Sequence, residues 1–420
     1  MSFLPIGIAA DDLTGAADTA AVFGDRDAPV SVSLDQRPRA WEGRRAFAVT
    51  TNSRSCPPEE AYEVTRESVK ALMGHGARLI YKKIDSNLRG NVGAELAGAR
   101  DAAQAPVVFA PAFPARGRTT IEGVVLVEGV PVADTEMAED PEAPVRCSDI
   151  AEVIRSQRSD LPVSHCSLAA VRAGPSALAE HLRDSVIVAA DAQTDADLDA
   201  IAQAALSIAP TPVLAGSAGL AAALARRLCR PARPPSWSAE RAGPILAVLA
   251  SSSHVMAAQA LKAAPDEGAA GVELPCQRLT RRDEPVPQLA EAMDDAGRAL
   301  GAGRDAIVYA GGPLPPVERP VELVVEHLAH LAFVLVKQAR PRGLLVGGGS
   351  TASGVLAALG AHAIDVDDEP LPGIAAGVVV GGELDGRPVV LKPGAAGDEE
   401  AVVRLLDYLG RRAAALEPAK

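Results

Sequence analysis

Short apolar runs alternate along the chain with Ala-rich stretches of helical length, and this alternation is the feature that most restricts the fold. Runs rich in Val, Ile and Leu suit strands buried on both faces, and strands joined by helices usually pair in parallel. The sequence therefore predicts an α/β fold in which largely parallel sheets are flanked by helices. In the first half we expect strands at residues 3–10, 46–50, 78–84, 106–110 and 185–189, and helices at 15–23, 58–73, 92–103 and 195–207.

A proline-rich segment at residues 230–236 separates two such α/β series. Proline fixes φ, and the segment lacks apolar periodicity, so it suits an extended linker. We therefore expect two domains, residues 1–235 and 236–420. In the second domain we expect strands at 244–250, 305–310 and 343–346, then a hairpin whose strands, 378–381 and 388–392, flank Asp385-Gly386.

The charge of the chain argues against nucleic acid as a partner. Its 420 residues include 41 Lys and Arg against 54 Asp and Glu, and the resulting net charge of −13 repels a phosphate backbone. No apolar run approaches the ~20 residues that a bilayer crossing needs, and the start lacks the pattern of a signal peptide. The five cysteines form no CxxC pair, which argues against a thiolate zinc site. We expect a cytoplasmic protein with no membrane partner.

Two carboxylates follow the first predicted strand. Asp11 and Asp12 stand at its carboxyl end, and in open α/β sheets ligands bind at this edge. An Asp there can accept the hydrogen bond or the proton of a substrate hydroxyl. The alternative is structural: Thr14 caps the next helix and one Asp is merely solvated.

A second polar cluster follows the strand expected at residues 78–84. The sequence KKIDSNLRGN, residues 82–91, again leads into a helix. Arg89 can hold a carboxylate through two parallel hydrogen bonds, and the helix N-terminus adds unpaired N–H groups. An exposed strand end with ordinary surface charge is the alternative.

Glycine- and hydroxyl-rich loops follow several strands of the second half. Gly347, Gly348, Gly349, Ser350 and Thr351 precede a helix expected at 352–359, so their backbone N–H groups can approach a phosphate closely. The P-loop pattern and the GxGxxG pattern are both absent, and a tight turn is the alternative. Together, however, four such strand ends favour a polyphosphate site; the other three are residues 251–253, 311–312 and 392–397.

The stretch 111–145 departs from the α/β pattern. It is rich in turn residues and contains short β-like pieces at 123–127 and 130–133. Loops of this length are often functional, and a flap over a cleft is one interpretation. An irregular surface loop with a small hairpin is equally compatible with the pattern.

Taken together, these motifs resemble the four-carbon acid sugar kinase family. The resemblance extends in order along nearly the whole chain. Its first-half motifs are IAADDLTGA at 8–16, KIDSNLRG at 83–90, PAFP at 111–114, GRTT at 117–120, GVP at 129–131 and AGSAGL at 215–220. Its second-half motifs are GGST at 348–351, PGI at 372–374 and KPG at 392–394.

The resemblance implies an ATP-dependent kinase of a four-carbon sugar acid such as threonate, erythronate or 3-oxo-tetronate, with ATP and Mg²⁺ as cofactors. It implies an N-terminal domain for the sugar acid and a C-terminal domain for the nucleotide. The sequence leaves the oligomeric state open, with a homodimer as one option. We expect phosphorylation of the terminal hydroxyl, O4. The motifs assign substrate binding to Asp11, Asp12, Lys83, Asp85, Arg89 and Gly90, and ATP binding to Ser251, Ser253, Gly347, Gly348, Gly349, Ser350, Thr351 and Gly394. They assign no metal ligand.

As a working mechanism, Arg89 holds the substrate carboxylate, and Asp12 or Asp85 orients or deprotonates the reacting hydroxyl. The chain also departs from the family pattern. Ser350 stands where related chains carry an acidic residue, and Ala395-Ala396 stand where they carry Asn-Phe. These changes leave a second hypothesis, a sensor that binds a sugar acid and a nucleotide without transferring phosphate. A Rossmann oxidoreductase is disfavoured because its glycine fingerprint is missing.

Overall fold

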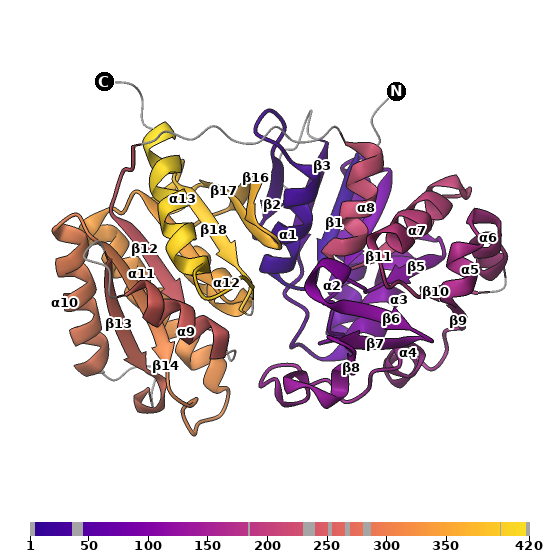
Figure 1. Ribbon diagram of the computed structural model, residues 1–420, viewed down its shortest axis with the longest axis horizontal. Coiled ribbons are helices and arrows are strands. Elements are labelled where there is room, and N and C mark those ends of the chain that lie inside the picture. The colour runs from indigo at the N-terminus through magenta and orange to yellow at the C-terminus, as the bar shows by residue number, and fades with distance from the viewer. Residues whose placement is uncertain are drawn as a thin grey trace. The chain divides into compact units, whose positions relative to one another are not determined.

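The structure, a computed structural model, describes residues 5–35, 45–183, 185–229, 240–250, 254–264, 269–279, 287–394 and 396–416. The chain divides into two compact units, Met1–Ala232 and Arg233–Lys420, and each unit is α/β as the sequence predicts (Figure 1). The predicted linker and the predicted boundary after residue 235 lie outside the described residues.

Unit 1 contains a parallel sheet with the strand order β2-β3-β1-β4-β11-β5-β10-β9. All five strands predicted for this half are present. The strands β2, β9 and β11 are additions. The bounds are β1 (Ile6–Ala10), β2 (Val30–Ser33), β3 (Ala46–Thr50), β4 (Leu79–Lys83), β5 (Val107–Ala110), β9 (Val163–Cys166), β10 (Ile187–Ala190) and β11 (Val213–Gly216).

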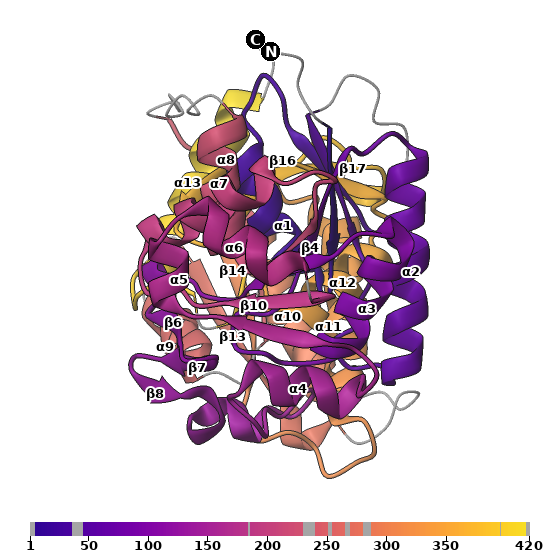
Figure 2. The same ribbon diagram turned by 90° about the vertical axis from the view of Figure 1, so that its right-hand side faces the viewer.

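Helices cover both faces of this sheet (Figure 2). One group consists of α1, α5, α6, α7 and α8, and the other of α2, α3 and α4. The helices α3 and α7 have the bounds that the sequence predicts, and a capping box between Thr194 and Asp197 fixes the start of α7. The bounds are α1 (Leu13–Phe23), α2 (Pro58–Gly74), α3 (Val92–Ala103), α4 (Ile150–Gln157), α5 (Leu168–Arg172), α6 (Pro175–Arg183), α7 (Asp195–Ser207) and α8 (Ala218–Leu228).

The strand order has a switch point at β1. After β1 the chain passes to β2 and β3 on one side, and it then crosses to β4 on the other. Ligands of open α/β sheets bind outside the carboxyl ends of the strands at such a point. The topology therefore places the segments after β1 and β4, where the sequence has its two polar clusters, at the preferred edge of the sheet.

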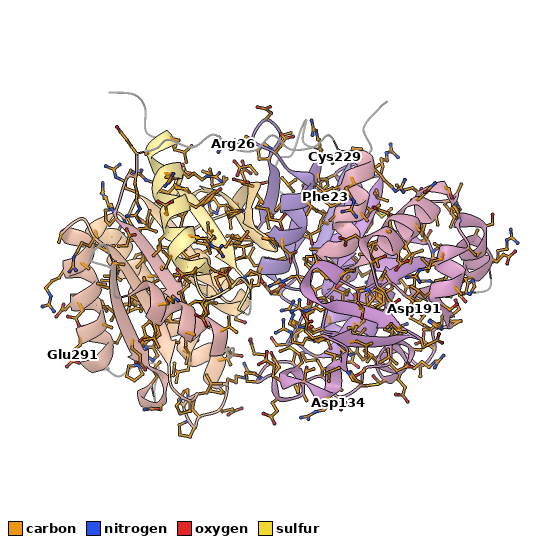
Figure 3. The ribbon with its side chains drawn as sticks, viewed as in Figure 1. Phe23, Arg26, Asp134, Asp191, Cys229 and Glu291 are labelled. Carbon is orange, nitrogen blue, oxygen red and sulfur yellow. The ribbon has the colours of Figure 1, made fainter. Side chains whose placement is uncertain are left out.

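The stretch 111–145 forms a small antiparallel sheet, which we call the flap. It consists of β6 (Arg118–Ile121), β7 (Val124–Val127) and β8 (Val130–Pro131). Val125 is fully buried in the main core of unit 1. Asp191, visible within unit 1 in Figure 3, accepts hydrogen bonds from the backbone N–H groups of Glu122 (2.9 Å) and Gly123 (3.0 Å). The segment is thus a packed part of the unit, not an irregular surface loop.

Unit 2 contains a mixed sheet with the strand order β13-β14-β12-β15-β18-β17-β16. Five neighbouring strands are parallel, namely β13, β14, β12, β15 and β18. The strand β17 runs antiparallel to both β18 and β16. The predicted hairpin is therefore confirmed as the pair β17 and β18. The bounds are β12 (Ile245–Leu249), β13 (Ala269–Pro275), β14 (Asp305–Gly311), β15 (Gly343–Gly347), β16 (Ala363–Leu371), β17 (Ile374–Val380) and β18 (Pro388–Lys392).

Helices also flank the sheet of unit 2. The helices α10, α11 and α12 pack in sequence, and α9 packs against α13. A second hydrophobic core lies between the sheet and α9 and α13. None of the helices in the described ranges combines the length and the apolar character of a membrane span. The bounds are α9 (His254–Ala263), α10 (Pro287–Gly301), α11 (Pro320–Ala339), α12 (Gly349–Ala358) and α13 (Ala401–Leu416).

Candidate active site

The two carboxylates after β1 have different surroundings. Asp12 is the N-cap of α1, because its Oδ1 accepts a hydrogen bond from the backbone N–H of Gly15 (2.9 Å). Thr14 donates its hydroxyl hydrogen to Asp12 Oδ2 (2.7 Å), so the alternative in which Thr14 itself is the cap is wrong. Asp11 is 2% exposed and points away from the helix start toward a basic group.

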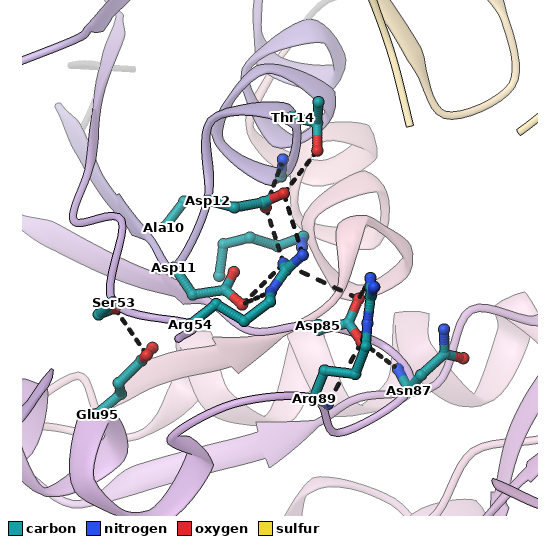
Figure 4. Close-up of polar contacts among 12 residues, drawn as sticks. Ala10, Asp11, Asp12, Thr14, Ser53, Arg54, Asp85, Asn87, Arg89 and Glu95 are labelled. Carbon is teal, nitrogen blue, oxygen red and sulfur yellow. Dashed lines mark hydrogen bonds and ion pairs between the residues drawn. The ribbon is translucent and has the colours of Figure 1, made fainter. Parts of the chain in front are cut away.

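That basic group is Arg54, which the sequence analysis missed. Its Nε lies 2.8 Å from Asp11 Oδ2, and its Nη2 lies 2.9 Å from Asp12 Oδ1 and 4.0 Å from Asp85 Oδ1 (Figure 4). Burial alone would lower the pKa of Arg54, but the charges of these three carboxylates outweigh it and raise that pKa well above its usual value. Arg54 therefore holds the carboxylates of the two strand ends together.

A signal for Arg54 was present in the sequence. Arg54 follows β3, and β3 is the neighbour of β1 on the side away from β4. The segment after β3, Thr51-Asn52-Ser53-Arg54, is polar like those after β1 and β4. The same argument from strand ends would have selected it once the strand order was known.

The two lysines that end β4 point to opposite faces of the sheet, as successive strand residues do. Lys82 Nζ forms a buried ion pair with Glu95 Oε2 of α3 (2.6 Å). Lys83 lies on the site side: a Cβ added at Gly15 would come within 2.7 Å of its Nζ. Burial tends to lower the pKa of Lys83, but nearby carboxylates, Asp18 foremost, outweigh burial and raise it. Lys83 therefore remains protonated at neutral pH.

Arg89 makes the bidentate contact with a carboxylate that the sequence predicts, but its partner is a carboxylate of the protein itself. Its Nε and Nη2 donate to the two oxygens of Asp85 (2.9 and 3.1 Å), and its Nη1 donates to Asp140 (3.1 Å). Burial would raise the pKa of Asp85, but Arg89, Arg54 and Lys83 outweigh it and hold that pKa well below its usual range. Asp85 is therefore ionised, and Arg89 is already neutralised.

Gly90 has a packing reason to be glycine. Its φ is +87°, and a Cβ there would lie 2.9 Å from the backbone oxygen of Arg54. Glycine thus allows the segments after β3 and β4 to lie against each other. This contact positions Arg54 whether or not Gly90 also touches a substrate.

Two further residues missed by the sequence analysis border this cluster. Asp18, on α1, is 8% exposed, and burial raises its pKa to about 6 despite the opposing charge of Lys83. Arg118, the first residue of β6, donates from Nη1 to the hydroxyl of Ser86 (2.8 Å). The flap therefore contributes a cation to the segment that follows β4.

The described part of the predicted ATP residues of unit 2 lies at the ends of neighbouring strands. The strands β14, β12, β15 and β18 are neighbours in that order and parallel, so their carboxyl ends lie along one edge of the sheet. Gly347 ends β15, and Gly348 has a φ of +98°, where a Cβ would collide with the carbonyl oxygen of Ala250. Gly394 follows β18 and accepts a hydrogen bond from Lys392 Nζ (3.2 Å). The predicted Ser251 and Ser253 lie outside the described residues.

The helix after β15 begins earlier than expected. Gly349, Ser350 and Thr351 form the first turn of α12, whereas the sequence analysis placed the helix start at residue 352. Gly348 is its N-cap and provides no side-chain hydrogen bond. The first N–H groups of a helix have no intrahelical partners, so this turn has the kind of donors that bind anions at other helix N-termini.

No group of three or more His, Cys, Asp or Glu side chains suited to a metal ion occurs in the described ranges of either unit. The acidic cluster of unit 1 is instead neutralised by Arg54, Arg89 and Lys83. The described residues thus fit no metal held by protein carboxylates alone.

Comparison with known families divides the chain in the same way. A sugar-binding N-terminal domain family matches residues 6–224, and a nucleotide-binding C-terminal domain family matches residues 246–402. The first match falls within unit 1 and the second within unit 2, and together they cover most of the chain.

Relatives of known activity match over nearly their full lengths. The D-threonate kinase of Salmonella typhimurium is 32% identical over 421 residues, covering 96% of this chain and 97% of the relative. The D-erythronate kinase of Heliobacterium modesticaldum is 29% identical, covering 96% of each chain. The 3-oxo-tetronate kinase of Methylobacterium radiotolerans is 30% identical, covering 97% and 99%. A Salmonella typhimurium LT2 protein of known crystal structure shares the fold, with a TM-score of 0.77 at 20% identity and coverage of 97% and 100%.

Proposed function

Because the chain belongs to the four-carbon acid sugar kinase family, we propose that it transfers the γ-phosphoryl group of ATP to the terminal hydroxyl, O4, of a four-carbon sugar acid. The class of acid includes threonate, erythronate and 3-oxo-tetronate, the substrates for which its relatives are named. In this reaction the hydroxyl oxygen bonds to the γ-phosphorus, the bond from that phosphorus to ADP breaks, and the hydroxyl proton leaves.

The observation that carries this proposal is the cluster at the switch point of unit 1. Asp11 and Asp12 from the loop after β1 and Asp85 from the loop after β4 meet there around Arg54, which follows β3 (Figure 4). Carboxylates held in this way accept hydrogen bonds from hydroxyl groups, while the cations around them offset the charge that an acid substrate brings. A polyhydroxy acid has both kinds of group.

The cluster suits phosphoryl transfer because that reaction needs positioning more than covalent chemistry. Burial tends to raise the pKa of Asp12, but Arg54, Lys83 and the Thr14 hydrogen bond outweigh it and lower that pKa. Asp12 and Asp85 are therefore ionised at neutral pH. We assign one of them to orient the attacking hydroxyl and to receive its proton as the phosphorus–oxygen bond forms.

We assign the nucleotide to unit 2, where the first turn of α12 would bind phosphate oxygens. The three glycines Gly347 to Gly349 let the backbone approach closely, and Thr351 is buried beside Gly348. Mg²⁺ usually binds through phosphates and waters with few protein ligands, which agrees with the lack of a metal cage in the described residues. Mg²⁺ would neutralise charge on the phosphates of bound ATP.

All five cysteines are free thiols, which supports a cytoplasmic location.

The proposal is tested by ADP release from Mg²⁺-ATP with D- and L-threonate, D- and L-erythronate and their 3-oxo forms, against a blank without acid. Glycerate and ribonate serve as controls for chain length. We expect turnover above about 1 s⁻¹ with at least one four-carbon acid. Calorimetric binding of an acid and ATP without turnover would support the sensor hypothesis that Ser350 and Ala395-Ala396 raise. If neither ligand binds, the assignment of the ligand class is wrong.

A further inference from the structure

Arg118 differs from the other arginines of the unit 1 site. Its Nη1 donates to Ser86 Oγ (2.8 Å), while its Nε is buried and has no hydrogen-bond partner. Within the described ranges no carboxylate forms an ion pair with Arg118, whereas Arg54 pairs with Asp11 and Asp12. Arg118 thus brings a positive charge that no carboxylate in the described part of the chain neutralises by contact.

The surroundings of Arg118 favour an added anion. Burial, followed by the like charges of Arg116 and Arg89, lowers the pKa of Arg118 to about 10, although Asp85 and Asp18 act in the opposite direction. An anion bound to the guanidinium would offset both main causes of this shift, since it supplies opposite charge and hydrogen-bond acceptors. The buried Nε is a donor already directed away from solvent.

Unpaired hydrogen-bond acceptors lie in the segments that follow β1 and β4. Asn87 Oδ1, next to Ser86, and Asp11 Oδ1 are both buried without a hydrogen-bond partner. A buried polar atom left unpaired costs about 1–3 kcal/mol, so a ligand that bonds to these atoms would recover that cost. The unpaired donor on Arg118 suits a carboxylate, and the unpaired acceptors on Asn87 and Asp11 suit hydroxyl groups.

We propose that Arg118, held by Ser86, binds the carboxylate of the substrate, and that Asn87 and Asp11 receive its hydroxyl groups. This assignment rests on the proposed function and replaces Arg89, whose guanidinium is bound to Asp85 and Asp140. A nucleotide phosphate is the other anion of the reaction. The carboxylate is favoured because Arg118, Ser86 and Asn87 all lie within the part of the chain that matches the sugar-binding domain.

The test compares a sugar acid with its carboxamide, which keeps the hydroxyl groups but lacks the charge. The acid is whichever four-carbon acid the wild-type protein turns over. We expect Arg118→Met to raise KM for the acid by about 10- to 100-fold, the range for a hydrogen bond to a charged group. In the wild-type protein, the KM for the amide should exceed the KM for the acid by a similar factor. Arg118→Met should change neither the KM for the amide nor the KM for ATP.

Three further variants separate a binding role from a structural one. Arg118→Lys keeps the charge without the planar fork and should give an intermediate KM for the acid. Ser86→Ala removes the hydroxyl that positions Nη1 and should raise the same KM by a smaller factor. If Arg118→Met does not fold, Arg118→Lys and Ser86→Ala still test the assignment. Arg226→Met breaks an exposed ion pair with Asp199 on the surface of unit 1 and should change none of these constants.

The outcomes are distinct. An unchanged KM for the acid in Arg118→Met, an equal loss for acid and amide, or a rise confined to the KM for ATP would each overturn the assignment while leaving the kinase intact. Absence of both turnover and calorimetric binding with every acid in the wild-type protein would overturn the proposed function, and the carboxylate site with it.

Discussion

Lys82 Nζ and Glu95 Oε2 are 2.6 Å apart, and their side chains are 0% and 1% exposed. This pair joins β4 to α3, and Ser53 donates its hydroxyl hydrogen to the other oxygen of Glu95 (2.7 Å). Glu95 therefore contacts both the end of β4 and the loop after β3, the two segments that lead to Asp85 and Arg54.

Removing one partner of this pair should destabilise unit 1 strongly. Glu95→Gln leaves the Lys82 charge buried without its counter-charge, and we expect a loss of about 3–5 kcal/mol in the free energy of unfolding, measured by urea denaturation. The double variant Lys82→Met/Glu95→Leu should recover most of that loss because no charge remains buried. Asp199→Asn, which breaks the exposed pair with Arg226, should cost less than about 1 kcal/mol. A Glu95→Gln loss as small as that of Asp199→Asn would contradict this account.

Replacing the hydroxyl-orienting carboxylate should slow turnover more than it weakens binding. We expect Asn at either position 12 or 85 to lower kcat by about 10²- to 10⁴-fold with a modest change in KM, and steady-state kinetics of Asp12→Asn and Asp85→Asn identify which Asp it is. Asp12 also caps α1, and an Asn there preserves the cap, but it removes the carboxylate that pairs with the buried Arg54, so a loss of stability should accompany the loss of kcat. If both variants turn over at the wild-type rate, neither carboxylate acts on the hydroxyl.

The raised pKa of the buried Asp18 should make the stability of the protein depend on pH. Burial raises its pKa from 3.8 to about 6, so the folded state binds this proton more tightly than the unfolded state does. The stability that this tighter binding contributes is complete below about pH 4 and is lost as the pH rises through about 6. Asp18→Asn, which stays neutral, should therefore gain about 3 kcal/mol on the wild-type protein between pH 4 and pH 8. Thermal melts at both pH values measure this gain, and an equal difference in Tm at the two would refute it.

Gly348 should not tolerate a side chain. Its φ of +98° strains any other residue, and a Cβ would also collide with the carbonyl oxygen of Ala250. We expect Gly348→Ala to lose ATP binding by calorimetry and to destabilise unit 2. Gly303→Ala is the matched control, because Gly303 has a φ of +77° but open space around its Cβ position. The control should cost only the backbone strain, about 1–2 kcal/mol, and keep ATP binding. Equal ATP affinity in the two variants would show that the close approach at Gly348 has no role.

Local patterns in the sequence predict much of this fold. The helices α3 and α7 and the strand β3 have the expected bounds because periodicity and capping are encoded within a few residues. The strands β2 and β9 were missed because each has only four residues and is interrupted by polar side chains, at alternate positions in β2 and at Ser164-His165 in β9. The start of α12 was misplaced because glycine obscures the first turn of a helix.

The candidate site was predicted less completely than the fold. Asp11, Asp12, Lys83, Asp85 and Arg89 do come together, because parallel strands bring their carboxyl ends to one edge. The partners of these residues depend on strand order and on the position of the flap, which involve contacts far apart in sequence. For this reason the contacts of Arg54, Asp140 and Arg118 with the site could be found only in the folded structure.

Asp191 has a consequence for how quickly a ligand can enter. This fully buried carboxylate fixes the flap through the N–H groups of Glu122 and Gly123, and it also binds the N–H group of Leu168 at the start of α5 (3.2 Å). The strand that carries Arg118 is thus anchored to the rigid sheet. Movement of β6 against the sheet of unit 1 should therefore not limit the rate constant at which an acid binds at Arg118.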